Sequence, residues 1–269
     1  MPLSRSFVIA LVILATSLYS VEAVAKTKPV EFVFMERPPY AFNHDGRLTG
    51  VFPEIVEETL KEVSFPYRFI STENWLDILK MLKLRKNMCN VGSYRTQARL
   101  AYYRYSDAVL EESTYLIAAN KAVAEKFGHQ VSIETLKTSD FVLGYQSGFS
   151  YGELIDKELI HSDVKKVNLS FVLLSTGSVK ERHIFSLLDL GRFDYAFFNP
   201  LEFYWNLSQF PDNKQNIVTL SIYPPVAVNP RYLMCNKNIA DKVLNEFNQA
   251  LHRVKRSPAF EAILAKYRQ

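Results

Sequence analysis

The chain has 269 residues, of which 48% are hydrophobic and 13% aromatic, and its formal net charge is +4. A composition this apolar is typical of a globular chain and excludes an intrinsically disordered one. Basic residues cluster only at 83–86 and 253–256, which favours solvated helix faces over the concentrated basic stripe of a nucleic-acid-binding protein. We therefore expect a folded protein with no nucleic-acid partner.

The N-terminus has the three-part pattern of a secretory signal peptide. Arg5 gives a basic start, residues 7–15 (FVIALVILA) are uninterrupted apolar residues, and residues 23–25 (AVA) form an A-x-A cleavage site. The apolar run is shorter than the roughly 20 residues of a membrane span, although an uncleaved N-terminal anchor is the alternative. We predict that residues 1–25 are removed on export and that the mature chain is periplasmic.

The first part of the mature chain alternates strands and helices. Residues 30–35 (VEFVFM) are typical of a buried strand, and Pro38-Pro39 ends it. The elements that follow are predicted as a helix at 54–63, a strand at 67–70, a helix at 75–84 and a strand at 89–93. This β-α-β-α-β order predicts a parallel sheet flanked by helices.

The middle of the chain repeats this order, and the last part adds strands and helices. Strands are predicted at 115–119, 141–145, 164–167, 193–198, 217–222 and 232–235, and helices at 151–159, 182–190 and, as a pair, over 240–267. Two successive sheet units predict a two-lobed α/β protein joined by a hinge. We expect lobe 1 to comprise residues 26–114 and 226–269, and lobe 2 residues 115–225.

The two cysteines, Cys89 and Cys235, are far apart in the sequence. In an oxidising compartment an isolated pair most simply forms one disulfide, which we predict here. Two buried thiols acting as small apolar residues are the alternative. A bridge would bring the C-terminal segment back beside the first lobe.

The segment at 92–99 (GSYRTQAR) directly follows a predicted strand. Ligands of open α/β sheets bind at the carboxyl ends of strands, and two facing lobes place that region in a cleft that a hinge can close. Thr96 is placed to cap a short helix, and Arg99 then lies one turn into it. The Arg99 guanidinium offers a rigid fork of donors that suits a carboxylate, although an ion pair with a surface acid such as Asp107 would explain it equally.

Three segments resemble one known family. Residues 92–99 are similar to the "G-x-x-x-T-x-x-R" segment of the family 3 extracellular solute-binding proteins, the periplasmic amino-acid-binding type. Residues 38–51 resemble that family's opening "P-P-[FY]-x-F … G-x-x-x-G-[FIV]", and residues 191–196 its "G-x-x-D-A" strand. The resemblance implies the type II periplasmic binding fold, in which each lobe is a mostly parallel sheet flanked by helices.

The resemblance also implies a set of ligand-binding residues. Arg99 would hold the carboxylate of the ligand, helped by backbone amides near Gly92 and Tyr94, and Tyr40 looks like one of the family's cleft aromatics. From the second lobe, Ser147, Gly148 and Phe149 lead into a predicted helix start, where free N–H groups receive anions.

The sequence departs from the family where amino-acid binders hold the ammonium of the ligand. Asn199 occupies one expected carboxylate position and Phe34 another, and a buried ammonium without a carboxylate is costly. Arg37 could add a second cation to the cleft, whereas Glu36 or Glu202 could restore the missing charge. We therefore expect a carboxylate-bearing, partly aromatic ligand, amino-acid-like or derived from an amino acid, in place of an ordinary free α-amino acid.

We expect a monomeric binding protein that delivers its small-molecule ligand to an ABC importer. A sensor that presents the ligand to a membrane receptor is one alternative, and a dehydratase on the same fold, with Glu202 or Glu153 as general acid, is another. The sequence predicts no cofactor and no metal site, because its histidines lie far apart and show no metal-ligand spacing. These are His44, His129, His161, His183 and His252.

Overall fold

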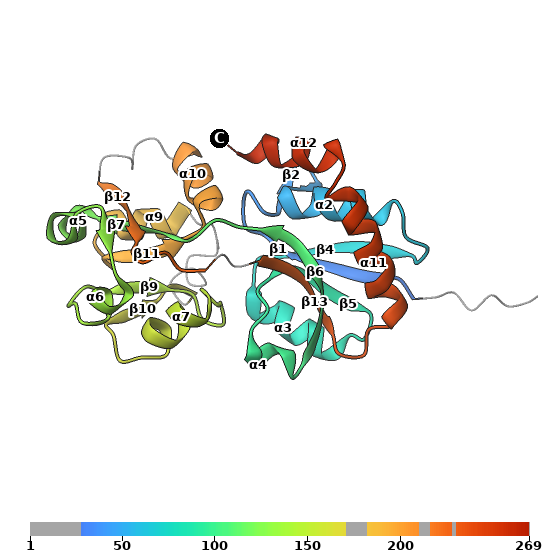
Figure 1. Cartoon of the computed structure of the whole chain (residues 1–269), viewed down its shortest axis with the longest axis horizontal. Helices are drawn as coiled ribbons and strands as arrows, with labels where there is room; N and C mark the ends of the chain where they lie inside the picture. Colours follow the sequence, from blue (N-terminus) through green and yellow to red (C-terminus); the bar gives the residue numbers. More distant parts are fainter. Residues whose placement is uncertain (1–27, 171–181, 210–215, 228–229, 269) are drawn as a thin grey trace, which may run out of the picture.

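The structure is a computed structural model that describes residues 28–170, 182–209, 216–227 and 230–268. The predicted signal peptide lies outside these residues. Two lobes lie side by side, and each has a sheet with helices around it (Figure 1). The two-lobed α/β fold predicted from the sequence is confirmed.

Lobe 1 is built on a five-stranded sheet with the order β4-β1-β5-β13-β6. Its strands are β1 (Val30–Met35), β4 (Tyr67–Thr72), β5 (Met88–Ser93), β6 (Tyr103–Glu111) and β13 (Pro230–Asn236). A small hairpin of β2 (Phe42–His44) and β3 (Arg47–Thr49) precedes the first helix. Its helices are α2 (Val51–Leu60), α3 (Trp75–Leu84), α4 (Gln97–Leu100), α11 (Asp241–Val254) and α12 (Pro258–Tyr267).

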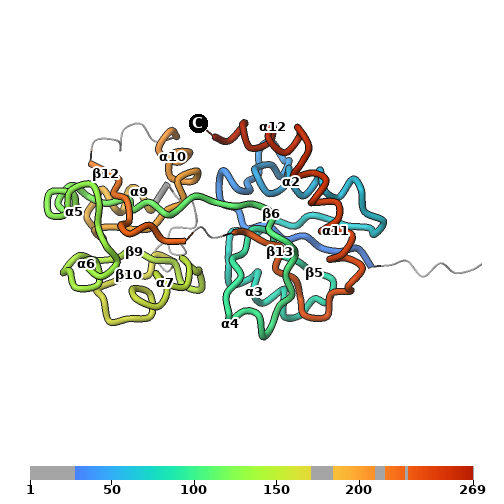
Figure 2. The backbone as a smooth tube through the Cα atoms, in the orientation of Figure 1, coloured from blue at the N-terminus to red at the C-terminus, as the bar shows by residue number. Residues whose placement is uncertain are grey.

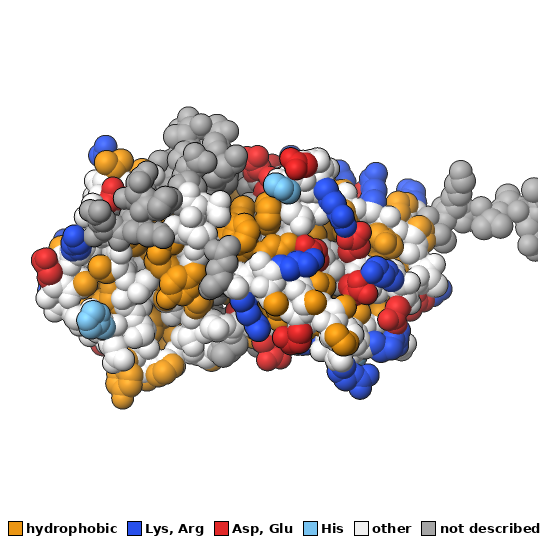
Figure 3. Space-filling view, turned by 90° about the horizontal axis from the view of Figure 1, so that it is seen from above, with side chains coloured by type: hydrophobic (Ala, Val, Ile, Leu, Met, Phe, Trp, Pro, Cys, Tyr) orange, Lys and Arg blue, Asp and Glu red, His pale blue; other side chains and the backbone are white. Residues whose placement is uncertain are grey.

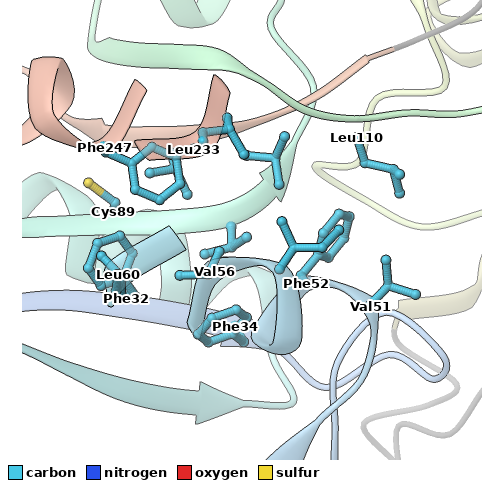
Figure 4. Packing of buried hydrophobic residues seen from close by; sticks show 14 of the residues in the cluster. Phe32, Phe34, Val51, Phe52, Val56, Leu60, Cys89, Leu110, Leu233 and Phe247 are labelled. Carbon is cyan, nitrogen blue, oxygen red and sulfur yellow. The ribbon is translucent and has the colours of Figure 1, made fainter. Parts of the chain in front are cut away.

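Helices cover both faces of the lobe 1 sheet. On one face α2, α11 and α12 enclose the larger core, in which Phe32, Leu60 and Phe247 meet (Figure 4). On the other face Ile78 and Leu82 of α3 pack on Val33. Residues of β1 therefore face a core on either side, which explains why all of its residues except Glu31 are apolar.

Lobe 2 has a six-stranded sheet with the order β10-β9-β11-β7-β12-β8. Its strands are β7 (Leu116–Asn120), β8 (Gln130–Val131), β9 (Leu143–Tyr145), β10 (Lys166–Asn168), β11 (Tyr195–Phe198) and β12 (Ile217–Ile222). Its helices are α5 (Lys121–Phe127), α6 (Ile133–Lys137), α7 (Glu153–Ile155), the π-helix η1 (Asp156–Ile160), α9 (Arg182–Asp189) and α10 (Pro200–Gln209).

The chain crosses between the lobes twice, and these crossings run between the two bodies in Figure 2. The first joins β6 to β7 through residues 112–115, and the second joins β12 to β13 through residues 223–229. Each crossing brings antiparallel strands into the sheets: β13 runs antiparallel to β5 and β6, and β7 runs antiparallel to β11 and β12. The predicted lobe limits at 114/115 and 225/226 fall within these crossings, and the exact limits remain a prediction.

A disulfide joins Cys89 of β5 to Cys235 of β13, two residues that face each other across neighbouring antiparallel strands. The bridge predicted from the sequence is therefore present in the structure. It links residues 146 positions apart, so it holds the returning C-terminal segment in the sheet of lobe 1. In the loop-closure model, a loop of this length stabilises the folded state by about 5 kcal/mol, an upper-range value.

Removing this bridge is expected to lower the thermal unfolding midpoint. For a chain of this size each kcal/mol corresponds to about 2–4 °C, so replacing both cysteines with alanine should lower the midpoint by about 10–20 °C, measured by calorimetry. Reductant should lower the midpoint of the unaltered protein and leave that of the double variant unchanged. Two titratable thiols in the native, unreduced protein would contradict the bridge.

Candidate functional site

A small cavity of about 60 Å³ lies between the lobes. From lobe 1, side chains that follow the ends of the parallel strands β1, β4 and β5 reach it, namely Arg37, Trp75 and Tyr94. From lobe 2, the segment after β9 supplies Phe149 and Tyr151. The cavity therefore lies at the carboxyl ends of strands from both sheets, which is where ligands of such folds bind.

Arg99 lines this cavity, and Thr96 caps the short helix α4 that carries it, as the sequence predicted. Its Nη1 donates to the Tyr94 carbonyl at 3.1 Å and its Nη2 to the Gly148 carbonyl of lobe 2 at 3.0 Å. Its Cζ lies 5.1 Å from the centre of the Trp75 ring. Burial lowers the pKa of Arg99, yet an arginine keeps its charge in proteins.

The partners of Arg99 are neutral carbonyls, and no ion pair to it occurs among the described residues. The surface acid considered from the sequence, Asp107, contacts His252 at 2.9 Å and accepts no bond from Arg99. Arg99 is half-buried, and a positive charge that is partly removed from water without a carboxylate partner carries a desolvation cost. Arg99 is thus a cation in the cavity wall whose charge an anionic ligand would balance.

The segment Ser147–Phe149 enters the site differently from the sequence-based expectation. The next helix, α7, begins at Glu153, two residues after the predicted start at Tyr151, so the amides of residues 147–149 are not the N-terminal amides of that helix. The amides of Ser147 and Phe149 already donate to Ser170 Oγ at 3.0 Å and to the Gln146 carbonyl at 3.3 Å. What reaches lobe 1 is the Gly148 carbonyl, which accepts from Arg99 and, at 2.8 Å, from Trp75 Nε1.

Aromatic rings form much of the cavity wall. Phe149 packs edge-on to Trp75 with ring centres 5.9 Å apart, and Tyr40 stacks on Phe52 at 5.1 Å. Gly92 also lines the cavity, and only glycine fits there: its backbone has a φ of +88°, and a Cβ would come within 2.4 Å of the Phe52 ring. The structure therefore brings Tyr40, Gly92 and Phe149 together at the cavity, as expected.

Arg37 also lines the cavity, and its charge is paired. Its guanidinium bonds to both carboxylate oxygens of Glu202, in the first turn of α10 of lobe 2. Glu202 is completely inaccessible, whereas the Arg37 side chain retains 17% exposure. The Arg37 Cζ lies 5.2 Å from the centre of the Phe149 ring. This ion pair joins the two lobes at the edge of the cavity.

A third arginine, Arg231 of β13, lies at the base of the cavity and was not predicted from the sequence. It bonds to Glu112, which follows β6, and donates to the Gly92 carbonyl at 3.2 Å. Its Cζ lies 3.7 Å from the centre of the Tyr94 ring. Burial lowers the pKa of Arg231, but the combined effect of Glu112 and the surrounding tyrosines outweighs burial and raises the pKa overall.

Three tyrosines extend this buried ion pair into a network. The hydroxyls of Tyr40 and Tyr94 both donate to Glu112. Tyr115, on the crossing, donates to the Tyr94 hydroxyl at 2.6 Å. Burial raises the pKa of Tyr94 to about 12, so the phenol stays protonated at neutral pH and serves as a donor. The network fixes the cavity-lining rings that come from lobe 1 and from the first crossing.

Asn199 does not line this cavity. It is buried behind Tyr94, with its Nδ2 3.5 Å from the Tyr94 hydroxyl, and its Oδ1 has no hydrogen-bond partner among the described residues. It borders a second cavity of about 270 Å³ between α10 and α12. The position where the family places a carboxylate is thus set back from the cavity in this structure, and the predicted contact between Asn199 and the ligand has no support from it.

The described residues hold no cluster of three or more potential metal ligands. Among them, no helix is long and apolar enough to cross a membrane. On the face shown in Figure 3, acidic and basic side chains are interspersed and no continuous basic stripe forms.

The family model of the bacterial extracellular solute-binding proteins, family 3, matches residues 32–269. The chain belongs to this family. No curated protein matches the chain. Among solved structures, an ancestral arginine-binding protein bound to arginine is similar with a TM-score of 0.70 at 18% identity, covering 91% of this chain and 100% of the other.

Two further solved structures show the same fold. The arginine-, lysine-, histidine-binding protein ArtJ of Geobacillus stearothermophilus is similar with a TM-score of 0.68 at 16% identity, covering 89% of this chain and 95% of the other. The ancestral amino acid-binding protein AncCDT-1, a precursor of cyclohexadienyl dehydratase, is similar with a TM-score of 0.67 at 17% identity, covering 90% and 96%. At these identities the likeness shows the fold alone.

Breaking the buried ion pair is expected to destabilise the fold strongly. Glu112→Gln keeps the shape of the side chain but leaves Arg231 without its counter-charge, which typically costs about 3–5 kcal/mol. The free energy of unfolding, measured by urea titration, should therefore fall by about 3–5 kcal/mol. Glu111→Gln, at the neighbouring exposed position, serves as the control and should change it little. Equal effects of the two changes would contradict the assigned role of Glu112.

Proposed function

We propose that this protein captures a small carboxylate-bearing solute between its lobes and delivers it to an ABC importer. The observation that carries this proposal is Arg99: a half-buried guanidinium in the wall of the interlobe cavity that bonds only to neutral carbonyls. The family supports a solute-binding role. The carboxylate would replace the Gly148 carbonyl at Arg99, because a charge-assisted hydrogen bond is roughly twice as strong as a neutral one.

The apolar part of the solute would lie against the aromatic wall. Trp75 and Phe149 come from different lobes and meet edge-on at the cavity, so a flat or apolar group between them would contact both lobes at once. Such a ligand favours the closed arrangement because it gains contacts that the open one lacks. Closure would then present a distinct surface to a membrane partner.

Export supports the same role. Residues 1–25 have the pattern of a signal peptide, and the matched family is extracellular. The disulfide between Cys89 and Cys235 suits an oxidising compartment. We therefore propose that the mature protein is periplasmic.

The alternative role is that of a sensor. A sensor would use the same ligand-induced closure, but its membrane partner would be a receptor instead of a permease. A dehydratase has less support, because neither proposed general acid reaches the cavity. Glu202 is inaccessible and bonded to Arg37, and Glu153 is exposed at the start of α7. A general acid must lie within hydrogen-bond reach of its substrate, so we propose binding without turnover.

Arg99→Ala is expected to weaken binding of the natural ligand by about 100-fold or more, because losing one partner of a buried charge pair costs about 2–5 kcal/mol. Arg99→Lys should also weaken it, since an ammonium lacks the planar fork. The measurement is calorimetric titration with the ligand that a thermal-shift screen of organic acids and amino acids returns.

Arg95→Ala is the matched control, because Arg95 is exposed in the same segment, and it should leave affinity unchanged. The unfolding midpoint of the free Arg99→Ala protein should stay within a few degrees of the original. Unchanged affinity in Arg99→Ala would remove this residue from the site.

A further inference from the structure

The ion pair of Arg37 and Glu202 is placed where it can select ligands by charge. Arg37 lines the cavity, whereas Glu202 lies behind it and is inaccessible. The cavity is therefore lined by the cation of the pair, Arg37. The carboxylate of the pair, Glu202, is buried and does not line the cavity. The Arg37 guanidinium also faces the Phe149 ring at 5.2 Å, which places it beside the aromatic wall where a ligand would lie.

Two other carboxylates near the cavity are also engaged. Glu112 accepts bonds from Arg231, Tyr40 and Tyr94. Asp156 accepts from the Ser150 hydroxyl and, at 2.7 Å, from the Tyr151 amide. An ammonium needs a carboxylate partner when it is buried, and both of these are already committed to protein donors.

We infer that the Arg37–Glu202 pair is a specificity determinant that excludes an ammonium from the cavity, so that the ligand is a carboxylic acid without a positively charged group. This inference rests on the proposed function and narrows its ligand class. Arg99 supplies the one charge that the ligand has to balance, and Arg37 repels a second positive charge. A carboxylic acid with an apolar or aromatic body satisfies both conditions.

The test compares matched compounds that differ only in the amino group. The unaltered protein is screened by thermal shift against the standard L-amino acids and against the corresponding acids that lack the α-amino group, such as 3-phenylpropionate for phenylalanine and indole-3-propionate for tryptophan. Dissociation constants follow by calorimetry. We expect at least one deaminated acid to bind about tenfold or more tightly than its amino-acid counterpart.

The exchanged pair Arg37→Glu/Glu202→Arg should reverse this preference. It keeps two opposite charges in contact but turns a carboxylate toward the cavity, which gives an ammonium its partner. We expect the ratio of the two dissociation constants to shift by about tenfold or more toward the amino acid. Exchanging the exposed pair, Arg253→Glu/Glu62→Arg, is the control and should leave the ratio unchanged.

The single variant Arg37→Gln covers the case in which the exchanged pair does not fold. It removes the cation from the wall and leaves the Glu202 carboxylate without its arginine partner. The ratio of the two dissociation constants should therefore also shift toward the amino acid. Preference for amino acids in the unaltered protein would overturn the inference and leave the proposed function intact. An unchanged ratio in both variants would also overturn it. No binding by either series would contradict the carboxylate ligand itself, and with it both proposals.

Discussion

The ion pair between Glu112 and Arg231 is the interaction on which the rest of the site depends. Glu112 follows β6 at the first crossing, and Arg231 lies in β13 just after the second. Both residues are buried. A buried pair contributes little net stability compared with apolar packing, because desolvation offsets its Coulomb attraction. Its importance here is geometric, because it joins the two strands that flank the crossings between the lobes.

The cavity wall takes its shape from that pair. Glu112 orients the hydroxyls of Tyr40 and Tyr94, and Arg231 lies on the face of the Tyr94 ring and bonds to the Gly92 carbonyl. These groups belong to lobe 1 or to the crossings, so their contacts with one another do not involve the body of lobe 2. Contacts of another kind link the lobes directly, such as Arg99 and Trp75 with the Gly148 carbonyl. The first set of contacts positions the lobe 1 side of the site, and the second set joins that side to lobe 2.

The sequence predicted those parts of the fold that have a local signal. The strand at 30–35, the helix at 75–84 and the cap at Thr96 are formed as expected, because apolar runs, helical spacing and a capping hydroxyl act within a few residues. Strand β6 was missed: its sequence, YRYSDAVLE, mixes charged and apolar residues without a regular alternation along its length, and it lies at the edge of the sheet beside β13. An edge strand can tolerate exposed polar residues, so the apolar alternation that reveals a strand is absent.

Long-range pairs explain what the sequence could not predict in the site. Glu112 and Arg231 are 119 positions apart, and Arg37 and Glu202 are 165 apart. No periodicity connects such residues, and the motifs that indicated Arg99 contain neither pair. Both arginine partners could be recognised only after the two crossings had placed β13 beside β6 and α10 near the end of β1.

These long-range pairs determine which of the arginines at the cavity have a carboxylate partner. Three arginines line it, Arg37, Arg99 and Arg231. Glu202 neutralises the first and Glu112 the last. Because both carboxylates are bonded to arginines at the wall, neither is free to accept a donor from a ligand, and Arg99 alone has only neutral partners. The departures from the family pattern at Asn199 and Phe34 agree with the engagement of Glu202. Amino-acid binders of the family place an acceptor for the ligand's ammonium at these positions. This chain instead has an amide behind Tyr94, a core phenylalanine, and a carboxylate that is already bonded to Arg37.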